Sequence, residues 1–158
     1  MFKKFLTTRS LCMSAMIAAL YAALTLLLAP ISYGALQCRI SEAMTLLPML
    51  LPQAVPGLAV GCLVSNLLSP VAIWDVLFGT AATLLAAIGT RHFRNQPVLA
   101  AMCPILSNGV IVGGTLAVFY GLPLWLTMLE VAAGEAIATA LGFVLIRALR
   151  RVRLDKYQ

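Results

Sequence analysis

The chain has 158 residues, of which 62% are hydrophobic and only 10% are Asp, Glu, Lys or Arg. Soluble globular domains are about half apolar and about a quarter charged, so this composition excludes an ordinary soluble enzyme. The net charge of +6 does not indicate a partner nucleic acid, because the eleven Lys and Arg gather at the chain ends and in one connection. The pattern is typical of an integral membrane protein, and the length predicts a single domain, 1–158.

The first predicted membrane span is residues 11–31, which follows a basic segment. Its apolar run is too long for the core of a signal peptide, so we expect it to stay in the membrane. Crossing the hydrocarbon core takes about 20 residues. Later apolar stretches near this length predict three more spans, at 74–89, 98–119 and 124–146.

Between these spans lies an apolar region, residues 43–68, with three prolines that include Pro52 and Pro56. Proline removes a backbone donor and breaks or kinks a helix, and the segment around these two prolines has the composition of a turn. We therefore expect two short helices, at 42–51 and 55–68.

The basic residues support this total of six helices. With six helices and a cytoplasmic N-terminus, ten of the eleven Lys and Arg are cytoplasmic, and Arg39 is the exception. With five helices, the seven from Arg91 onward would lie outside, against the positive-inside rule. We predict an all-α membrane protein with six transmembrane helices, two of them short, and both termini in the cytoplasm.

Five ionisable residues remain after the cytoplasmic charges are set aside: Arg39, Glu42, Asp75, Glu130 and Glu135. Each costs about 2.5–3.5 kcal/mol inside a bilayer on insertion scales, so such groups usually face a cavity and mark function. We expect them to line one pocket open to the outside, and a purely structural ion-pair network is the alternative. Asp75 and Glu42 also lie near predicted helix starts, where a carboxylate complements the helix dipole.

Glu130 and Glu135 lie within the last predicted helix, about 7.5 Å apart along its axis and about 140° apart around it. The two side chains cannot both point into one pocket, and the sequence leaves open which one does. Asn108, in the middle of the fifth predicted span, either contacts a ligand or bonds another helix.

The external loop 30–41 is the longest outer connection, and it is either a lid over the pocket or a simple connector. In an extended segment Gln37 and Arg39 would face the same side. Aromatic residues at outer helix ends form membrane-interface belts, with ligand stacking as the second interpretation. Among them, we count Tyr33 and Trp74 as candidate site residues.

The first predicted helix carries Ala15, Ala19 and Ala23 at four-residue spacing. Small residues at this spacing let another helix approach closely. A partner helix and internal packing explain the pattern equally well.

The sequence lacks the common motifs for metal binding, phosphate binding and hydrolysis. No cysteine pair has CxxC spacing and His92 is the only histidine, so we predict no metal site. The sequence holds no phosphate-binding loop, HExxH or GxSxG motif. We therefore expect neither an enzyme nor a cofactor, and a chain this small has few helices for a transporter acting alone.

Four segments together are similar to the QueT family, the substrate-binding S-components of energy-coupling factor (ECF) transporters. They are 33–43 (YGALQCRISEA), 75–83 (DVLFGTAAT), 108–113 (NGVIVG) and 134–135 (GE). The resemblance implies an S-component-like bundle in a bacterial plasma membrane, in contact with lipid and not with nucleic acid. It also implies docking on a transmembrane coupling subunit that works with two cytoplasmic ATPases.

The substrate implied by the resemblance is a queuosine precursor or a queuine-like 7-deazaguanine base. Such a base presents adjacent N–H donors, from which a carboxylate accepts charge-assisted hydrogen bonds. It also has a carbonyl oxygen, to which Arg39, Gln37 or Asn108 would donate. Another water-soluble vitamin is the first alternative. The second is a small membrane assembly protein without a transport role.

Overall fold

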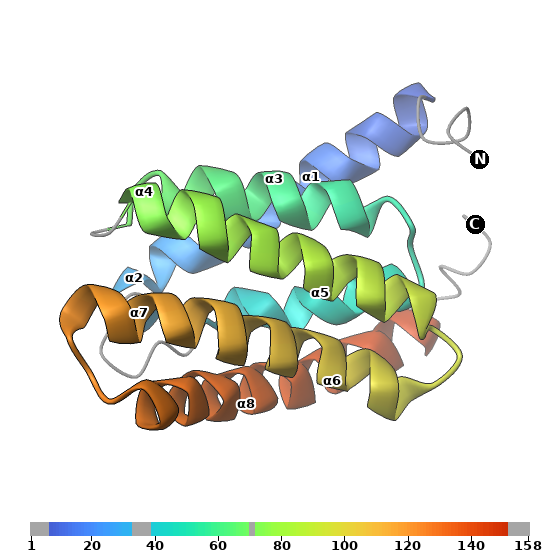
Figure 1. Ribbon diagram of the computed structural model, residues 1–158. Coiled ribbons are helices and arrows are strands. Elements are labelled where there is room, and N and C mark those ends of the chain that lie inside the picture. The colour runs from blue at the N-terminus through green and yellow to red at the C-terminus, as the bar shows by residue number, and fades with distance from the viewer. Residues whose placement is uncertain (1–6, 33–38, 70–71, 152–158) are drawn as a thin grey trace.

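The computed structural model describes residues 7–32, 39–69 and 72–151, and these residues form helices joined by turns, with no strand among them (Figure 1). In chain order its elements are α1 (Thr8–Leu27), α2 (Ala29–Ser32), η2 (Ile40–Met49), α3 (Ala54–Asn66), α4 (Ala72–Trp74), η3 (Asp75–Gly79), α5 (Thr80–His92), α6 (Pro97–Ser107), η4 (Asn108–Val112), α7 (Gly113–Tyr120) and α8 (Leu124–Arg151).

These elements form six principal helical segments, as the sequence predicts. The elements α4, η3 and α5 follow one another without a break, as do α6, η4 and α7, while α1, η2, α3 and α8 each form one segment. By length and composition, Thr8–Leu27, Pro97–Tyr120 and Leu124–Arg151 are able to cross a membrane, and Ala54–Asn66 is a shorter apolar helix. The segment predicted at 74–89 is longer than expected, because it continues to His92.

The proline-containing region divides into two short helices, with boundaries close to those predicted. The first, η2, is a 3₁₀ helix with Pro48 inside it, and ten residues is long for this type of helix. All of its residues but Ile40 are buried, since η2 contacts α1, α3, α5, α6 and α8. It therefore forms the centre of the bundle, between α5 and α8 in Figure 1.

Glycines bring the surrounding helices close to one another. A Cβ atom at Gly57 would lie 2.8 Å from the carbonyl oxygen of Ser14, and one at Gly61 would lie 2.8 Å from that of Ala18. These two positions allow α3 to pack directly on the backbone of α1, which is how small residues serve helix pairs in membranes.

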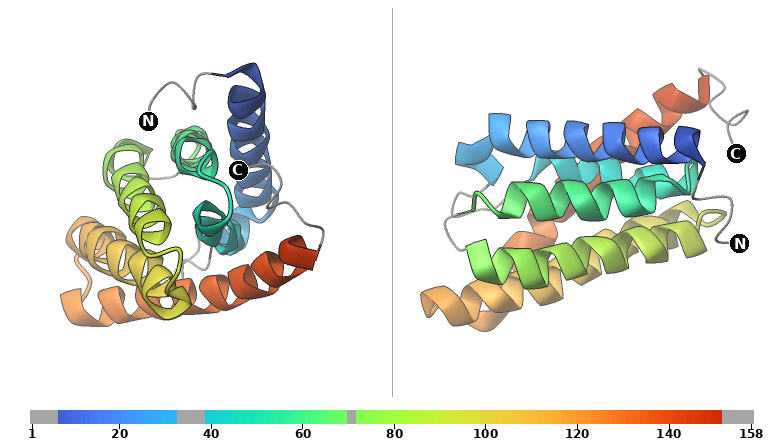
Figure 2. Two further views of the ribbon diagram at one scale, coloured as in Figure 1. Left: turned by 90° about the vertical axis from the view of Figure 1, so that its right-hand side faces the viewer. Right: turned by 90° about the horizontal axis from the view of Figure 1, so that it is seen from above.

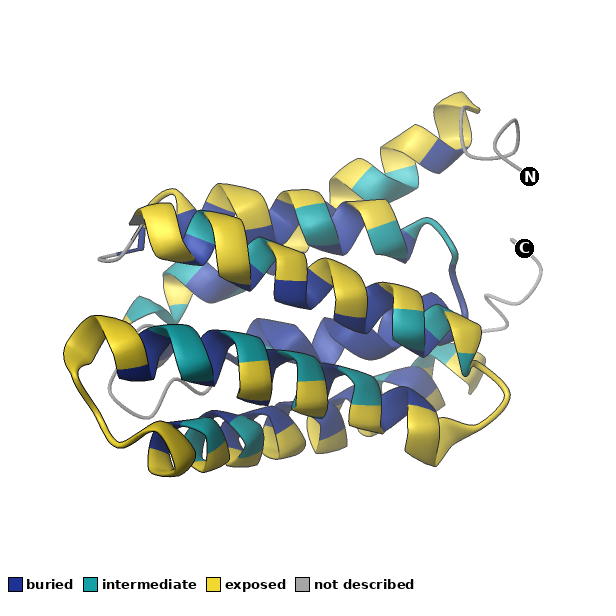
Figure 3. Ribbon diagram, in the orientation of Figure 1, coloured by how far each residue is buried: buried dark blue, intermediate teal, exposed yellow. Residues whose placement is uncertain are grey.

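The outer surface of the bundle is apolar, and its interior holds polar groups. Large hydrophobic side chains are exposed along α3, α5, α6 and α8, and Figure 3 shows exposed outer faces around a buried centre. This arrangement suits a protein surrounded by lipid, because hydrocarbon is as apolar as leucine.

Six of the seven arginines in the described chain lie at one end of the bundle. They are found at the start of α1, at the end of α5 and in the turn after it, and at the end of α8, and these ends lie together (Figure 2). The seventh, Arg39, is buried inside the protein.

Candidate functional site

A small cavity lies between the start of η2, the segment η4 and the middle of α8. Its lining is made by Arg39, Glu42, Asn108, Val112, Val131 and Glu135, and its free volume is about that of a water molecule. The structure thus brings together four of the polar residues that the sequence singles out.

Glu42 is held by donors from two other helices. The phenol of Tyr21 in α1 donates to its Oε1, and the hydroxyl of Thr83 in α5 donates to the same atom over 3.3 Å. Its other oxygen, Oε2, is buried and has no hydrogen-bond partner among the described residues.

Glu135 on α8 has a similar arrangement. The side-chain amide of Asn108 donates to its Oε1 over 2.9 Å. Its Oε2 is buried and, within the part of the chain that the structure describes, accepts no hydrogen bond. Two carboxylate oxygens without donors therefore belong to side chains that line one cavity.

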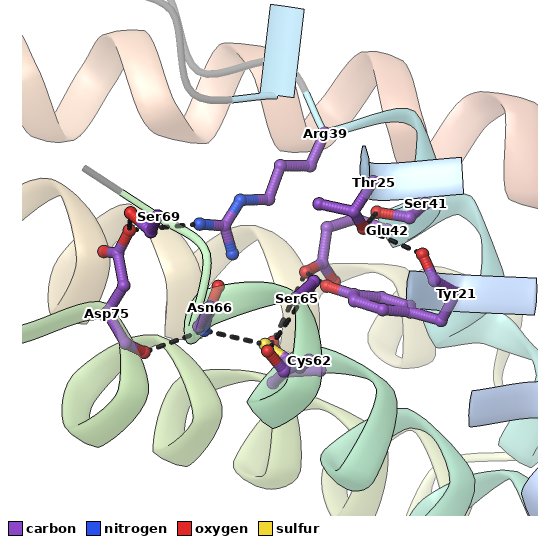
Figure 4. A network of polar contacts seen from close by, with 11 residues as sticks. Tyr21, Thr25, Arg39, Ser41, Glu42, Cys62, Ser65, Asn66, Ser69 and Asp75 are labelled. Carbon is purple, nitrogen blue, oxygen red and sulfur yellow. Dashed lines mark hydrogen bonds and ion pairs between the residues drawn. The ribbon is translucent and has the colours of Figure 1, made fainter. Parts of the chain in front are cut away.

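Arg39 forms an ion pair with Asp75, with 3.5 Å between Nη2 and Oδ2, and both side chains are buried. Ser69 also donates to Oδ2 of Asp75, and the Asn66 amide donates to its backbone oxygen over 2.7 Å. Figure 4 shows Arg39 pointing toward Asp75 and Ser69. Asp75 is therefore the partner of a buried cation, and its role is more than to complement a helix dipole.

Local backbone structure places two of these side chains. Asp75 and Asn108 are each the first residue of a π-helical turn, η3 and η4, a rare feature that is frequent at functional sites. The two turns contact each other. A Cβ atom at Gly109 would lie 3.0 Å from that of Ala132, so this glycine allows α8 to bring Glu135 up to Asn108.

Among the described residues in and beside the cavity, carboxylates outnumber cations. Glu42 and Glu135 line the cavity with Arg39 as the only cation beside them, and Arg39 is also paired with Asp75. An uncompensated buried carboxylate is unfavourable unless a donor or a cation meets it. The cavity is therefore suited to a group that donates hydrogen bonds.

Trp74 and Glu130 do not line the cavity. Trp74 is exposed and stacks on Phe78 with 5.7 Å between ring centroids, which favours the membrane-belt interpretation. Glu130 is half-buried and does not belong to the lining. Tyr33 and Gln37 belong to residues 33–38, half of the loop 30–41, which lie outside the described residues.

Sequence reasoning missed the uncharged groups that support the charged ones. Tyr21 and Thr83 hold Glu42, whereas Asn66 and Ser69 hold Asp75. A signal was present, because a hydroxyl or amide within an apolar span needs a partner. Val112 and Val131, which form the apolar part of the lining, carry no such signal.

The alanines of α1 divide between two faces of the helix. Ala15, Ala19 and Ala23 are exposed, whereas Ala18 and Ala22 are buried. No other part of the described chain covers the exposed alanines, so the four-residue spacing does not serve internal packing here.

Comparison with models of protein families finds the family described as QueT transporter, which matches residues 11–151 and so most of the chain. Comparisons with curated proteins and with solved structures find no match.

Proposed function

The chain belongs to the QueT transporter family, the S-component family of ECF transporters, and we propose that it captures a queuosine precursor or queuine-like 7-deazaguanine base. It is a multi-pass membrane protein that works with other ECF components. Binding of a water-soluble base requires a polar site inside an apolar bundle, and the lining of the cavity between η2, η4 and α8 supports this role. The cavity has room for about one water molecule, so its lining side chains must move apart to admit a base.

One observation carries the proposal: Oε2 of Glu42 and Oε2 of Glu135 are buried without partners among the described residues, and both side chains line the same cavity. Leaving such an acceptor without a donor costs about 1–3 kcal/mol or more. A 7-deazaguanine has adjacent amide and amine N–H donors on one edge and a ring N–H on the other. Two separate carboxylates therefore match its two donor edges.

The rest of the lining complements the rest of the base. The Arg39 guanidinium is a donor for the ring carbonyl oxygen, and Val112 and Val131 offer apolar walls to the faces of the heterocycle. A base with a cationic aminomethyl arm also fits the excess of carboxylates over cations, because that arm provides the missing positive charge.

The exposed alanines of α1 serve as the docking face for the transmembrane coupling subunit, which works with two cytoplasmic ATPases. Ala15, Ala19 and Ala23 leave the backbone of α1 open to close approach by a second helix. The arginine-rich end of the bundle is the cytoplasmic side of a bacterial plasma membrane, in accord with the positive-inside rule. Both termini then face the cytoplasm and the cavity serves the outside.

The experiment is to purify the protein, denature it and identify the released small molecule by mass spectrometry. We expect a 7-deazaguanine base, and less of it from the Glu135→Gln protein prepared in parallel. Release of an unrelated vitamin would keep the transport role and overturn the substrate. A protein that releases no ligand, binds no base in calorimetry and copurifies with no ATPase would instead be a membrane assembly protein.

A further inference from the structure

Tyr21 is a fully buried tyrosine in the middle of α1 whose hydroxyl is used on a carboxylate of the cavity. Its relative exposure is 0%, and its Oη donates to Oε1 of Glu42. A phenol has one proton to donate. Tyr21 donates it to Oε1 of Glu42, which leaves Oε2 available to the cavity. Figure 4 shows the ring of Tyr21 beside Glu42.

The orientation of Glu42 depends on this contact because the last torsion of a glutamate is only weakly restricted by its own structure. A free carboxylate at this position would rotate and exchange its two oxygens. With Oε1 engaged by a donor, rotation is blocked and Oε2 is the atom that remains for a ligand.

Thr83 cannot do this alone. Its Oγ1 lies 3.3 Å from Oε1 of Glu42, which is long for a bond between a hydroxyl and a carboxylate, and it shares a second contact of 3.3 Å with Sγ of Cys62. The Tyr21 phenol lies closer to Oε1 of Glu42 than the Thr83 hydroxyl does. Tyr21 is therefore the stronger donor of the pair.

We propose that Tyr21 is a positioning residue of the substrate site, which holds Glu42 so that Oε2 meets a donor of the bound base. This inference rests on the proposed function. Tyr21 does not itself line the cavity, so its effect on binding passes entirely through Glu42. The role is separate from the packing of its ring, which a phenylalanine preserves.

The test compares Tyr21→Phe with Thr25→Val in the full-length protein, using 7-deazaguanine as the probe in calorimetry. Thr25 is the matched control, because it is a buried hydroxyl one turn further along α1 that bonds Ser41 and not a carboxylate. We expect Tyr21→Phe to weaken binding about tenfold or more, as for a lost hydrogen bond to a charged group. Thr25→Val should stay within about twofold of the wild type.

A double-mutant cycle separates positioning from a general structural effect. In a Glu42→Leu protein, adding Tyr21→Phe should change affinity by less than about twofold, because no acceptor oxygen remains for the phenol to hold. Thermal unfolding of each protein in detergent verifies that it is folded, and ligand-induced shifts of the unfolding temperature report binding that is too weak for calorimetry.

The outcomes distinguish failure of the positioning role from failure of the proposed function. If the wild type binds 7-deazaguanine and Tyr21→Phe binds it equally well, the positioning role is wrong and the proposed function stands. An equal loss from Tyr21→Phe in the wild-type and Glu42→Leu backgrounds also overturns the role, since the tyrosine then acts on structure alone. A wild type that binds no deazapurine base overturns both.

Discussion

The side-chain amide of Asn108 donates to Oε1 of Glu135 over 2.9 Å, across 27 positions in the sequence. The bond fixes the carboxyl group of Glu135 through one of its two oxygens. The second oxygen, Oε2, remains for whatever enters the cavity. A polar pair of this kind at bilayer depth suits binding better than structural bonding alone.

Replacing Glu135 with Gln should weaken binding of 7-deazaguanine by about 30- to 1,000-fold, or on the order of 2–4 kcal/mol. The substitution exchanges an acceptor oxygen for an N–H donor that faces the donors of the base. Calorimetry with 7-deazaguanine measures the loss. A parallel titration with 7-deazahypoxanthine, which lacks the exocyclic amine, should show a smaller difference between the wild type and the variant.

Glu130→Gln is the matched control for this experiment, because Glu130 is on the same helix, is only half-buried and does not line the cavity. Its affinity should stay near that of the wild type. If Glu135→Gln is equally neutral, the two carboxylates have structural roles and the binding site lies elsewhere.

Replacing Ala19 with Leu should abolish transport into cells while the purified protein still binds its substrate. The added side chain would project from the exposed face of α1 and hold a docking helix away. Uptake of labelled base and calorimetry measure the two properties separately. Ala140→Leu, at an exposed position on α8, should leave both unchanged, and parallel loss of binding in Ala19→Leu would contradict a docking role.

Gly61→Ala should destabilise the protein by about 1–3 kcal/mol, as overpacking does. Its Cβ would lie 2.8 Å from the carbonyl oxygen of Ala18 and 2.9 Å from Cβ of Tyr21, so α3 would have to move away from α1. At Gly114 the nearest contact is 3.4 Å, to the flexible end of Met128. Thermal unfolding in detergent should therefore show a lower midpoint temperature for Gly61→Ala than for the wild type. The midpoint of Gly114→Ala should be unchanged.

The orientation in the membrane is tested with single cysteines in a protein whose own four cysteines are replaced. A cysteine at Leu122, in the exposed turn before α8, should react with an impermeant maleimide added to intact cells. One at Gln96, in the turn after α5, should react only after the cells are opened. The reverse pattern would place the arginine-rich end outside.

The helical segments could be predicted from sequence because their determinants are local. Apolar length gave the long spans, Pro52 and Pro56 separated the short ones, and the distribution of arginines favoured six over five. The 3₁₀ form of η2 and the π turns at Asp75 and Asn108 were not predicted, since they depend on packing between segments distant in sequence.

The rotation of each helix could not be predicted, and this limited the prediction of the site. In a soluble protein an apolar stripe marks the buried face, but in lipid the outer face is apolar too. The sequence alone did not distinguish Ala19, which is exposed, from Ala18, which is buried. Tyr21 could not be predicted for a related reason, because nothing local in the sequence shows which hydroxyl side chains are buried.

The central position of η2 has a consequence for biosynthesis. This segment leaves the ribosome early, but α8 packs against it so closely that a Cβ atom at Gly142 would lie 2.6 Å from the carbonyl oxygen of Ala43. Until α8 has entered the bilayer, one side of η2 and the polar groups near Glu42 lack their cover. The newly made chain must therefore shelter this segment, at the translocon or among its first helices, until α8 has been inserted.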